Sequence, residues 1–277
     1  MLQSQDISQS DYEKFRLFLE QACGILLGDG KQYLIISRLT KLLRDEKIGS
    51  VSELLTAIQM GTPAHLRNSV IDAMTTNETS WFRDGSPYFI LEKNMLAELE
   101  QTTKAPCRIW SSACSSGQEP YTISMLITEY LRKNSGSKLS SSQIVATDIS
   151  TKMLTMARLG LYETNTLDRG LSLARKQQFF KAVGEQWEIS QDVKQRVQFR
   201  EQNLLQSYTG LGRFDVIFCR NVLIYFSAQR KSDILTRMAQ ALNPGGYLFL
   251  GASETISGYS DAFEIKRYPE GVVYQRR

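Results

Sequence analysis

One segment of the chain combines small side chains with a carboxylate in a way that suits a nucleoside-like ligand. Residues 111–120 read SSACSSGQEP and begin at the end of a strand candidate, residues 108–112. Small side chains let the backbone approach a ligand closely. The segment has one glycine and no lysine, so it lacks both the dinucleotide pattern G-x-G-x-x-G and a cation for a phosphate. A ligand without phosphate groups fits it better than NAD or ATP.

Two acidic residues extend this pattern. Asp148 follows a strand candidate at residues 144–146, and a carboxylate at that position accepts hydrogen bonds from both hydroxyls of a ribose. Glu119 lies at the end of the small-residue segment, where it would attract an amino group or a sulfonium. Its alternative role is a first-turn charge that complements the helix dipole. Together, these residues favour an adenosine-type ligand.

The histidine and cysteine content excludes several other chemistries. The only histidine is His65, and the four cysteines, Cys23, Cys107, Cys114 and Cys219, form no C-x-x-C pair. The sequence therefore predicts no metal site and no triad with a histidine base. Each cysteine lies in or beside an apolar stretch, so we expect small buried side chains.

The elements that must position these residues alternate between strand and helix patterns, which predicts an α/β fold with a parallel, doubly wound sheet. In such a sheet, ligands bind beyond the carboxyl ends of the strands. The strand candidates are residues 108–112, 144–146, 197–200, 214–219, 247–251 and 271–275, the last of them expected at an edge of the sheet. The main helix candidates are residues 120–131, 151–159 and 228–242.

The N-terminal segment has a different pattern. Apolar side chains recur at helical spacing over residues 12–27, 34–43, 52–59 and 63–74, which predicts a small all-helical unit. A basic run lies within it and has a local excess of three positive charges: Lys31, Arg38, Lys41, Arg44 and Lys47 against Asp45 and Glu46. Two interpretations stay open, a solvated helix face and a docking face for an acidic partner.

Composition bounds the remaining possibilities. The 277 residues, 42% hydrophobic and 22% charged, allow one large domain or two smaller ones. No apolar stretch is long enough to span a membrane, and residues 1–10 lack the layout of a signal peptide, so we expect a cytoplasmic location without membrane insertion. The net charge of +4 and the lack of a long basic, aromatic-interleaved surface argue against nucleic acid.

Four segments, in this order along the chain, resemble the CheR-type chemotaxis receptor methyltransferases: residues 75–83 (TTNETSWFR), 109–121 (IWSSACSSGQEPY), 146–150 (ATDIS) and 214–226 (FDVIFCRNVLIYF). The resemblance covers nearly the whole chain. The resemblance implies a helical N-terminal domain (1–72), a linker carrying active-site residues (73–90) and a Rossmann-like class I methyltransferase domain (91–277) with a small inserted β-subdomain (176–199).

The resemblance also implies a reaction and its residues. The family transfers the methyl group of S-adenosylmethionine to glutamates of chemoreceptors, which gives a glutamate methyl ester and S-adenosylhomocysteine and adapts receptor signalling. Residues near the reacting centre fall on Arg83 and Tyr225. The family's cofactor contacts fall on Asn77, Thr79, Arg83, Glu119, Asp148, Asn203, Leu204, Arg220 and Asn221.

The chemistry of this reaction suits the residues. A glutamate carboxylate has a pKa of about 4.3, so it is ionised at neutral pH and needs no general base. Catalysis then consists mostly of positioning the carboxylate and the sulfonium methyl in line. The planar fork of Arg83 can hold a carboxylate, and the phenol of Tyr225 can position the methyl donor or the substrate.

One departure from the family concerns the receptor. Some members hold a C-terminal receptor pentapeptide through a glycine-containing loop of the β-subdomain, but here residues 179–189 are shorter and contain only Gly184. We therefore expect recognition independent of the pentapeptide, through Lys31, Arg38, Lys41 and Arg44. Two alternatives remain: a methyltransferase of the same fold acting on a small molecule or nucleic acid, and a non-catalytic sensor. The presence of Arg83 and Tyr225 favours an enzyme.

Overall fold

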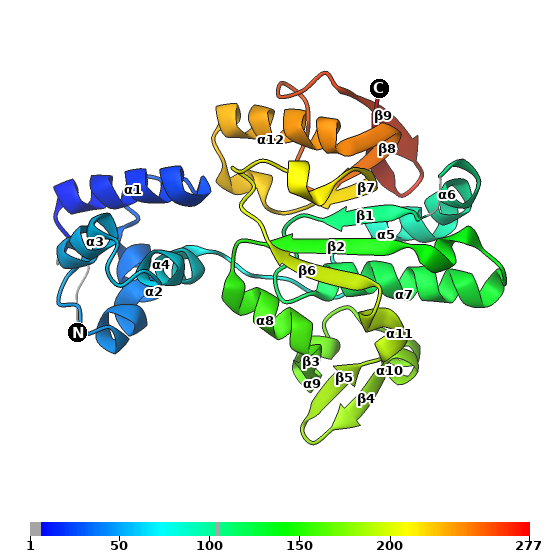
Figure 1. Cartoon of the computed structure of the whole chain (residues 1–277), viewed down its shortest axis with the longest axis horizontal. Coiled ribbons are helices and arrows are strands. Elements are labelled where there is room, and N and C mark those ends of the chain that lie inside the picture. Colours follow the sequence, from blue (N-terminus) through cyan, green and yellow to red (C-terminus); the bar gives the residue numbers. More distant parts are fainter. Residues whose placement is uncertain (1–6, 104–105) are drawn as a thin grey trace. The chain divides into compact units, whose positions relative to one another are not determined.

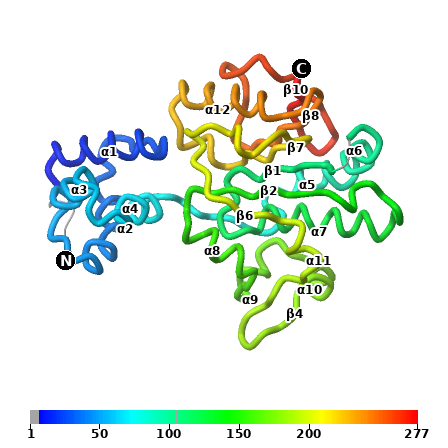
Figure 2. The backbone as a smooth tube through the Cα atoms, viewed as in Figure 1, coloured from blue at the N-terminus to red at the C-terminus, as the bar shows by residue number. Residues whose placement is uncertain are grey.

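The computed structural model describes residues 7–103 and 106–277, which form two compact units (Figures 1 and 2). Of the described residues, the helical unit contains 7–76 and 225–230, and the sheet unit contains 77–103, 106–224 and 231–277. Within the described ranges, no helix has both the length and the apolar character that crossing a membrane requires.

Four helices form the N-terminal part of the helical unit: α1 (Gln9–Cys23), α2 (Gln32–Asp45), α3 (Val51–Met60) and α4 (Leu66–Met74). Their apolar faces meet in a core where Leu19, Leu39 and Val70 are fully buried. Ser8 and Ser50 cap α1 and α3, because each side chain accepts a hydrogen bond from the backbone N–H three residues further on. The four helices predicted from apolar spacing are confirmed, with ends that differ by a few residues.

The sheet unit is built on a seven-stranded sheet with the order β6-β2-β1-β7-β8-β10-β9. Neighbouring strands from β6 to β8 are parallel, and β10 and β9 are antiparallel. All six positions of β7 are buried, as expected of a strand covered on both faces. The strands are β1 (Arg108–Ser111), β2 (Gln143–Asp148), β6 (Val197–Glu201), β7 (Phe214–Cys219), β8 (Leu242–Leu250), β9 (Phe263–Tyr268) and β10 (Gly271–Arg276).

Helical segments connect these strands. The longer ones are α7 (Gln118–Lys133), α8 (Thr151–Leu159) and α12 (Ala228–Ala241), all three near their predicted positions. The shorter ones are α5 (Ser86–Ile90), η2 (Leu91–Met95), α6 (Leu96–Thr102), η3 (Lys138–Ser141), α9 (Thr164–Leu167), α10 (Leu173–Phe179), α11 (Gln191–Lys194), η4 (Thr209–Leu211) and η5 (Leu223–Tyr225).

The predicted α/β fold is confirmed, and the structure adds detail at one edge of the sheet. The expected separator between α12 and the next strand, residues 243–246, lies inside β8. A register shift opposite Phe214 and Val216 accommodates the extra residues. The final strand, β10, does not lie at an edge as predicted. It pairs with β8 on one side and with β9 on the other, both antiparallel, and the sequence pattern does not predict β9.

A second sheet has three antiparallel strands in the order β3-β5-β4: β3 (Leu161–Glu163), β4 (Phe180–Val183) and β5 (Gln186–Ile189). Its core contains Trp81, whose ring contacts Tyr162 and Phe180 edge-on at centroid distances of 5.0 and 5.3 Å. Gly170 lies so close to this tryptophan that a Cβ atom would be 2.0 Å from the Trp81 carbonyl oxygen. The small sheet and residue 170 together therefore fix the position of Trp81.

Candidate functional site

The small-residue loop after β1 is held by backbone contacts to the neighbouring strands. Ser112 N donates to Phe218 O and Cys114 N to Thr147 O, each at 2.9 Å. The loop ends at Gly117, which has φ +96° and leaves so little room that a Cβ atom would be 3.1 Å from both Ala157 Cβ and Tyr162 Oη. Only glycine combines this backbone conformation with such a close approach. The loop is therefore fixed where α7 begins.

Asp148 links this loop to the end of β2. Its carboxylate accepts hydrogen bonds from Ser115 N at 2.7 Å and from Ser150 N at 2.9 Å. The Ser115 hydroxyl donates in turn to Asn77 O at 2.9 Å, so three segments distant in sequence meet here. A carboxylate has about four acceptor positions, which makes it a suitable partner for vicinal hydroxyls.

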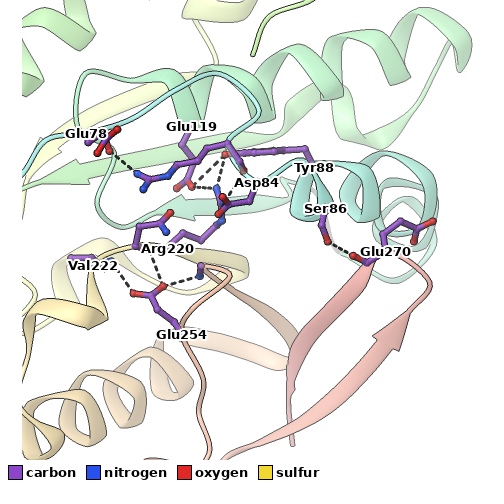
Figure 3. Close-up of polar contacts among 12 residues, drawn as sticks. Glu78, Asp84, Ser86, Tyr88, Glu119, Arg220, Val222, Glu254 and Glu270 are labelled. Carbon is purple, nitrogen blue, oxygen red and sulfur yellow. Dashed lines mark hydrogen bonds and ion pairs between the residues drawn. The ribbon is translucent and has the colours of Figure 1, made fainter. Parts of the chain in front are cut away.

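Glu119 and Arg220 form a buried ion pair beside the loop (Figure 3). Glu119 accepts from Arg220 Nη1 at 3.0 Å and from the Ser111 hydroxyl at 2.8 Å. Arg220 Nη1 also lies 2.9 Å from the Tyr88 hydroxyl, and Arg220 Nη2 donates to Asp84 Oδ2 at 2.8 Å. The negative charge of Glu119 is therefore matched by a neighbouring cation within the protein.

Burial and charge together set the protonation of this cluster. Burial lowers the pKa of Arg220, but the Tyr88 hydroxyl and the carboxylates of Glu119 and Asp84 outweigh it and leave that pKa raised. Burial raises the pKa of Tyr88 as well. The cluster therefore keeps a cationic arginine and a neutral phenol across the physiological pH range. Asp84 and Tyr88 were not among the predicted site residues, because nothing in their spacing connects them with a residue more than 130 positions away.

Arg220 also holds the segment that carries Arg83. Its Nη2 atom donates to the Arg83 carbonyl oxygen at 2.7 Å, and the Arg83 side chain turns back to donate to Glu78 O at 2.7 Å (Figure 3). Phe82 and Asp84, on either side of Arg83, have φ of +48° and +67°. Arg83 thus lies in a tightly turned backbone that Arg220 stabilises, and Thr79 lies half-buried in the same segment.

The other predicted cofactor contacts follow β6 and β7. Asn203 Oδ1 accepts from Leu205 N at 2.9 Å, which closes a turn after β6. Leu204 is buried, and its carbonyl oxygen accepts from Tyr208 Oη and from Arg237 Nη2. Asn221 follows β7 with φ +57°. The structure thus links Asn77 to Asp148 through Ser115, and Glu119 to Arg220 directly. Gln202 connects Asn203 to Asp148, because its backbone N–H donates to Asp148 O and its side chain donates to Asn203 O, each at 3.0 Å.

The second residue predicted near the reacting centre, Tyr225, is the last residue of η5 and belongs to the helical unit. Its carbonyl oxygen accepts a hydrogen bond from Leu26 N at 3.0 Å. The phenol is half-buried.

The four cysteines are free and buried, which confirms their predicted role as small core residues. Cys114 lies in the small-residue loop, and burial raises the pKa of its thiol well above the usual range. Burial raises the pKa of Cys219, at the end of β7, in the same way. Both stay protonated at neutral pH, so neither is a nucleophile.

The predicted receptor-binding cations of the helical unit have different environments. The side chains of Lys41 and Arg44 are 78% and 73% exposed and lie near Asp45. Arg38 points inward, and its guanidinium donates to the carbonyl oxygens of Met74 and Thr75 and to the Thr76 hydroxyl. Arg38 therefore holds the end of α4. Lys31 contacts the Tyr33 ring at the start of α2, with Nζ 5.6 Å from the ring centroid.

Residues 112–117 and Asp148 fit a nucleoside ligand without phosphates. No lysine or arginine lies among residues 112–117, the backbone is held close by Gly117, and a carboxylate lies at the end of the neighbouring strand. This is the position at which open α/β sheets bind ligands.

Comparison with known proteins gives matches along almost the whole chain. The family model described as CheR methyltransferase, SAM binding domain, matches residues 77–272, and the model described as CheR methyltransferase, all-alpha domain, matches residues 10–75.

Three curated relatives are about half identical to this chain. Chemotaxis protein methyltransferase Cher2 of Pseudomonas putida is 50% identical, over 96% of this chain and 98% of the relative. Chemotaxis protein methyltransferase 1 of Pseudomonas aeruginosa is 49% identical, over 98% and 99%. Chemotaxis protein methyltransferase 1 of Vibrio cholerae is 50% identical, over 97% and 98%.

Proposed function

This chain belongs to the CheR family of S-adenosylmethionine-dependent methyltransferases, and from that premise we propose that it methylates glutamate side chains of chemoreceptors. The products are a glutamate methyl ester and S-adenosylhomocysteine. The observation that carries the proposal is the match, at about half identity and over nearly full length, to proteins named chemotaxis protein methyltransferases. Because chemoreceptors present their methylation segments in the cytoplasm, we place the enzyme there.

The cofactor is proposed to bind at the carboxyl ends of β1 and β2. Bound S-adenosylmethionine supplies a methyl group on a sulfonium. The Asp148 carboxylate would accept hydrogen bonds from the ribose hydroxyls, and the loop at residues 112–117 would line the nucleoside with backbone. Glu119 would act together with Arg220, because their ion pair supports the loop. The further contacts carried over from the family are Asn77, Thr79, Arg83, Asn203, Leu204 and Asn221.

The receptor carboxylate needs orientation more than activation. A glutamate with a pKa of about 4.3 is ionised at neutral pH, so no residue has to remove a proton. Arg83 is proposed to orient this carboxylate through its planar fork. The turned backbone around Arg83, held by Arg220, fixes the point from which this side chain extends. Tyr225 is the second residue that we propose near the reacting centre.

Receptor recognition is proposed to use the exposed cations of the helical unit. Lys41 and Arg44 present positive charge to solvent from α2, with Lys31 at the start of the same helix, and a glutamate-rich receptor helix presents the opposite charge. Arg38 contributes indirectly, because it holds α4 against α2. The turn between β4 and β5 is short, with Gly184 at φ +59°. We therefore propose recognition that does not depend on a C-terminal pentapeptide.

Reversing Lys41 and Arg44 to Glu together is expected to lower the rate of receptor methylation by about tenfold at low salt, because opposed charges slow encounter. The effect should shrink as ionic strength rises, because exposed charges are screened beyond about 10 Å at 0.1 M salt. Initial rates with a receptor cytoplasmic domain at several salt concentrations measure both quantities. S-adenosylhomocysteine affinity should stay unchanged.

A matched control reverses Lys14 and Arg67, which are exposed on α1 and α4 and change the net charge by the same amount. We expect this pair to retain most of the rate. Equal losses in both pairs would assign the effect to net charge. Strong dependence on a receptor pentapeptide, with no response to Lys41 and Arg44, would assign recognition to the small sheet.

A further inference from the structure

The carboxylate of Glu254 lies among four backbone N–H groups of the sheet unit. Oε2 accepts from Asn221 N and from Gly251 N, each at 2.7 Å. Oε1 accepts from Leu223 N at 2.7 Å and from Val222 N at 2.9 Å. Figure 3 shows Glu254 beneath Val222, with dashed lines that mark its hydrogen bonds. A single side chain thus satisfies three consecutive amides of one loop and one of another.

The two loops follow neighbouring parallel strands. β7 ends at Cys219 and β8 at Leu250, and these two residues are paired in the sheet. Both loops therefore leave the sheet at the same edge, where open α/β sheets bind their ligands. Glu254 lies in the second loop and fixes the backbone of the first, which contains Asn221.

The loops after β7 and β8 approach each other very closely at Gly251. A Cβ atom at Gly251 would lie 2.7 Å from Glu254 Oε2 and 2.8 Å from Asn221 N, so the loops approach each other only because residue 251 is glycine. Asn221 has φ +57°, a conformation that Asn tolerates better than most residues. Three consecutive N–H groups that face one side of the chain require an acceptor, and a carboxylate is the strongest one.

The loop that Glu254 holds begins at Arg220. The Arg220 guanidinium contacts Glu119, Asp84 and the Arg83 carbonyl oxygen, while Glu254 holds the backbone of the three residues that follow. The Arg220 side chain is thus held by the carboxylates of Glu119 and Asp84, and the backbone that follows it is held by the carboxylate of Glu254. A shift of this backbone would move Asn221, one of the proposed cofactor contacts.

We propose that Glu254 is a positioning residue for cofactor binding and methyl transfer. Its carboxylate sets the conformation of residues 221–223, and through this backbone it places Asn221 against the cofactor. The inference rests on the proposed function only in taking Asn221 as a cofactor contact, and it does not depend on which substrate receives the methyl group.

The decisive variant is Glu254→Gln, which keeps the size of the side chain. Its amide has one acceptor oxygen, so its NH₂ group would face two of the four N–H donors. Losing two of these charge-assisted hydrogen bonds loosens the backbone of residues 221–223, and cofactor binding must then restore its conformation. We expect the Kd for S-adenosylhomocysteine, measured by calorimetry, to rise by about tenfold. Amide hydrogen exchange should quicken at residues 221–223 and stay unchanged in β1 and β2.

The matched control is Asp215→Asn. Asp215 is also a carboxylate of the β7 region, and it accepts from Arg108 N and Asn243 Nδ2 at 2.8 Å each. It lies at the opposite end of β7 from the loop. We expect Asp215→Asn to lower the melting temperature and to leave the Kd unchanged. A similar loss of affinity in both variants would mean that general destabilisation is the cause and would overturn the proposal.

An unchanged Kd for Glu254→Gln would also overturn the proposal, whether or not hydrogen exchange at residues 221–223 responds. If Glu254→Gln does not fold, Glu254→Asp takes its place, because it keeps the charge but is one methylene too short to reach both loops. Failure of the proposed function gives a different result. A wild-type chain that binds S-adenosylhomocysteine and methylates no receptor would contradict the receptor assignment and leave the role of Glu254 intact.

Discussion

Replacing Arg220 with Met is expected to lower the free energy of unfolding by about 3–5 kcal/mol, because a buried ion pair that loses one partner leaves the other charge uncompensated. Glu119 and Asp84 would both lose their cation, and the Tyr88 hydroxyl and the Arg83 carbonyl oxygen would lose a donor. Denaturant titration of the whole chain measures the loss. Methyl transfer should fall as well, because the Arg83 segment loses its anchor.

Arg200→Met serves as the control for this variant. Arg200 is exposed on β6 in the same unit, and surface substitutions usually change stability by less than about 0.5 kcal/mol. If Arg220→Met costs no more than Arg200→Met, then the cluster around Arg220 does not stabilise the sheet unit. Arg220→Lys should recover only part of the loss, since an ammonium lacks the planar fork that reaches Glu119 and Asp84 together.

Replacing Asp148 with Ala is expected to weaken S-adenosylmethionine binding by roughly 100-fold or more. Each hydrogen bond to a charged acceptor contributes roughly 1.5–3 kcal/mol, and two ribose hydroxyls would lose their partner. The variant also removes the acceptor of Ser115 N and Ser150 N, which loosens the loop. Calorimetry on the folded variant gives the affinity.

Asp148→Asn separates these two contributions. The amide keeps one acceptor oxygen and the size of the side chain, so we expect a smaller loss than for Asp148→Ala. Circular dichroism and thermal unfolding establish that each variant is folded before binding is measured. An affinity equal to that of the wild type in folded Asp148→Ala would remove Asp148 from the cofactor site.

Strands and helices with a clear pattern of apolar residues are the parts of the fold that the sequence predicts. The segment from Phe214 to Cys219, apolar except for Asp215, is long enough to indicate a buried strand. The position of Asp148 at the end of a strand follows in the same way. β3 has only three residues, and β9 lies at an edge where the exposed residues, 264, 265 and 267, do not alternate regularly with buried ones. Such segments have too little pattern to be distinguished from loops.

The contacts of the site depend on long-range packing, and the sequence alone does not predict them. The Arg220 guanidinium contacts Asp84 and Glu119, which are 136 and 101 positions away, and no local pattern indicates these partners. Arg38 was expected on an exposed basic face. In the structure, the Arg38 guanidinium instead contacts the end of α4. Its position on α2 is in line with Lys41 and Arg44 but also next to the buried apolar residues of that helix. Glu254 has no sequence signal other than its place after a strand.

The fate of a labelled methyl group tests the proposed function most directly. The chain is incubated with methyl-labelled S-adenosylmethionine and the cytoplasmic domain of a chemoreceptor, and the labelled receptor is then treated with mild alkali. Receptor glutamate methylation predicts label on the receptor that alkali releases as volatile methanol, because a methyl ester hydrolyses under these conditions. Label that withstands alkali, or that appears only on a small molecule or nucleic acid, would contradict the proposal.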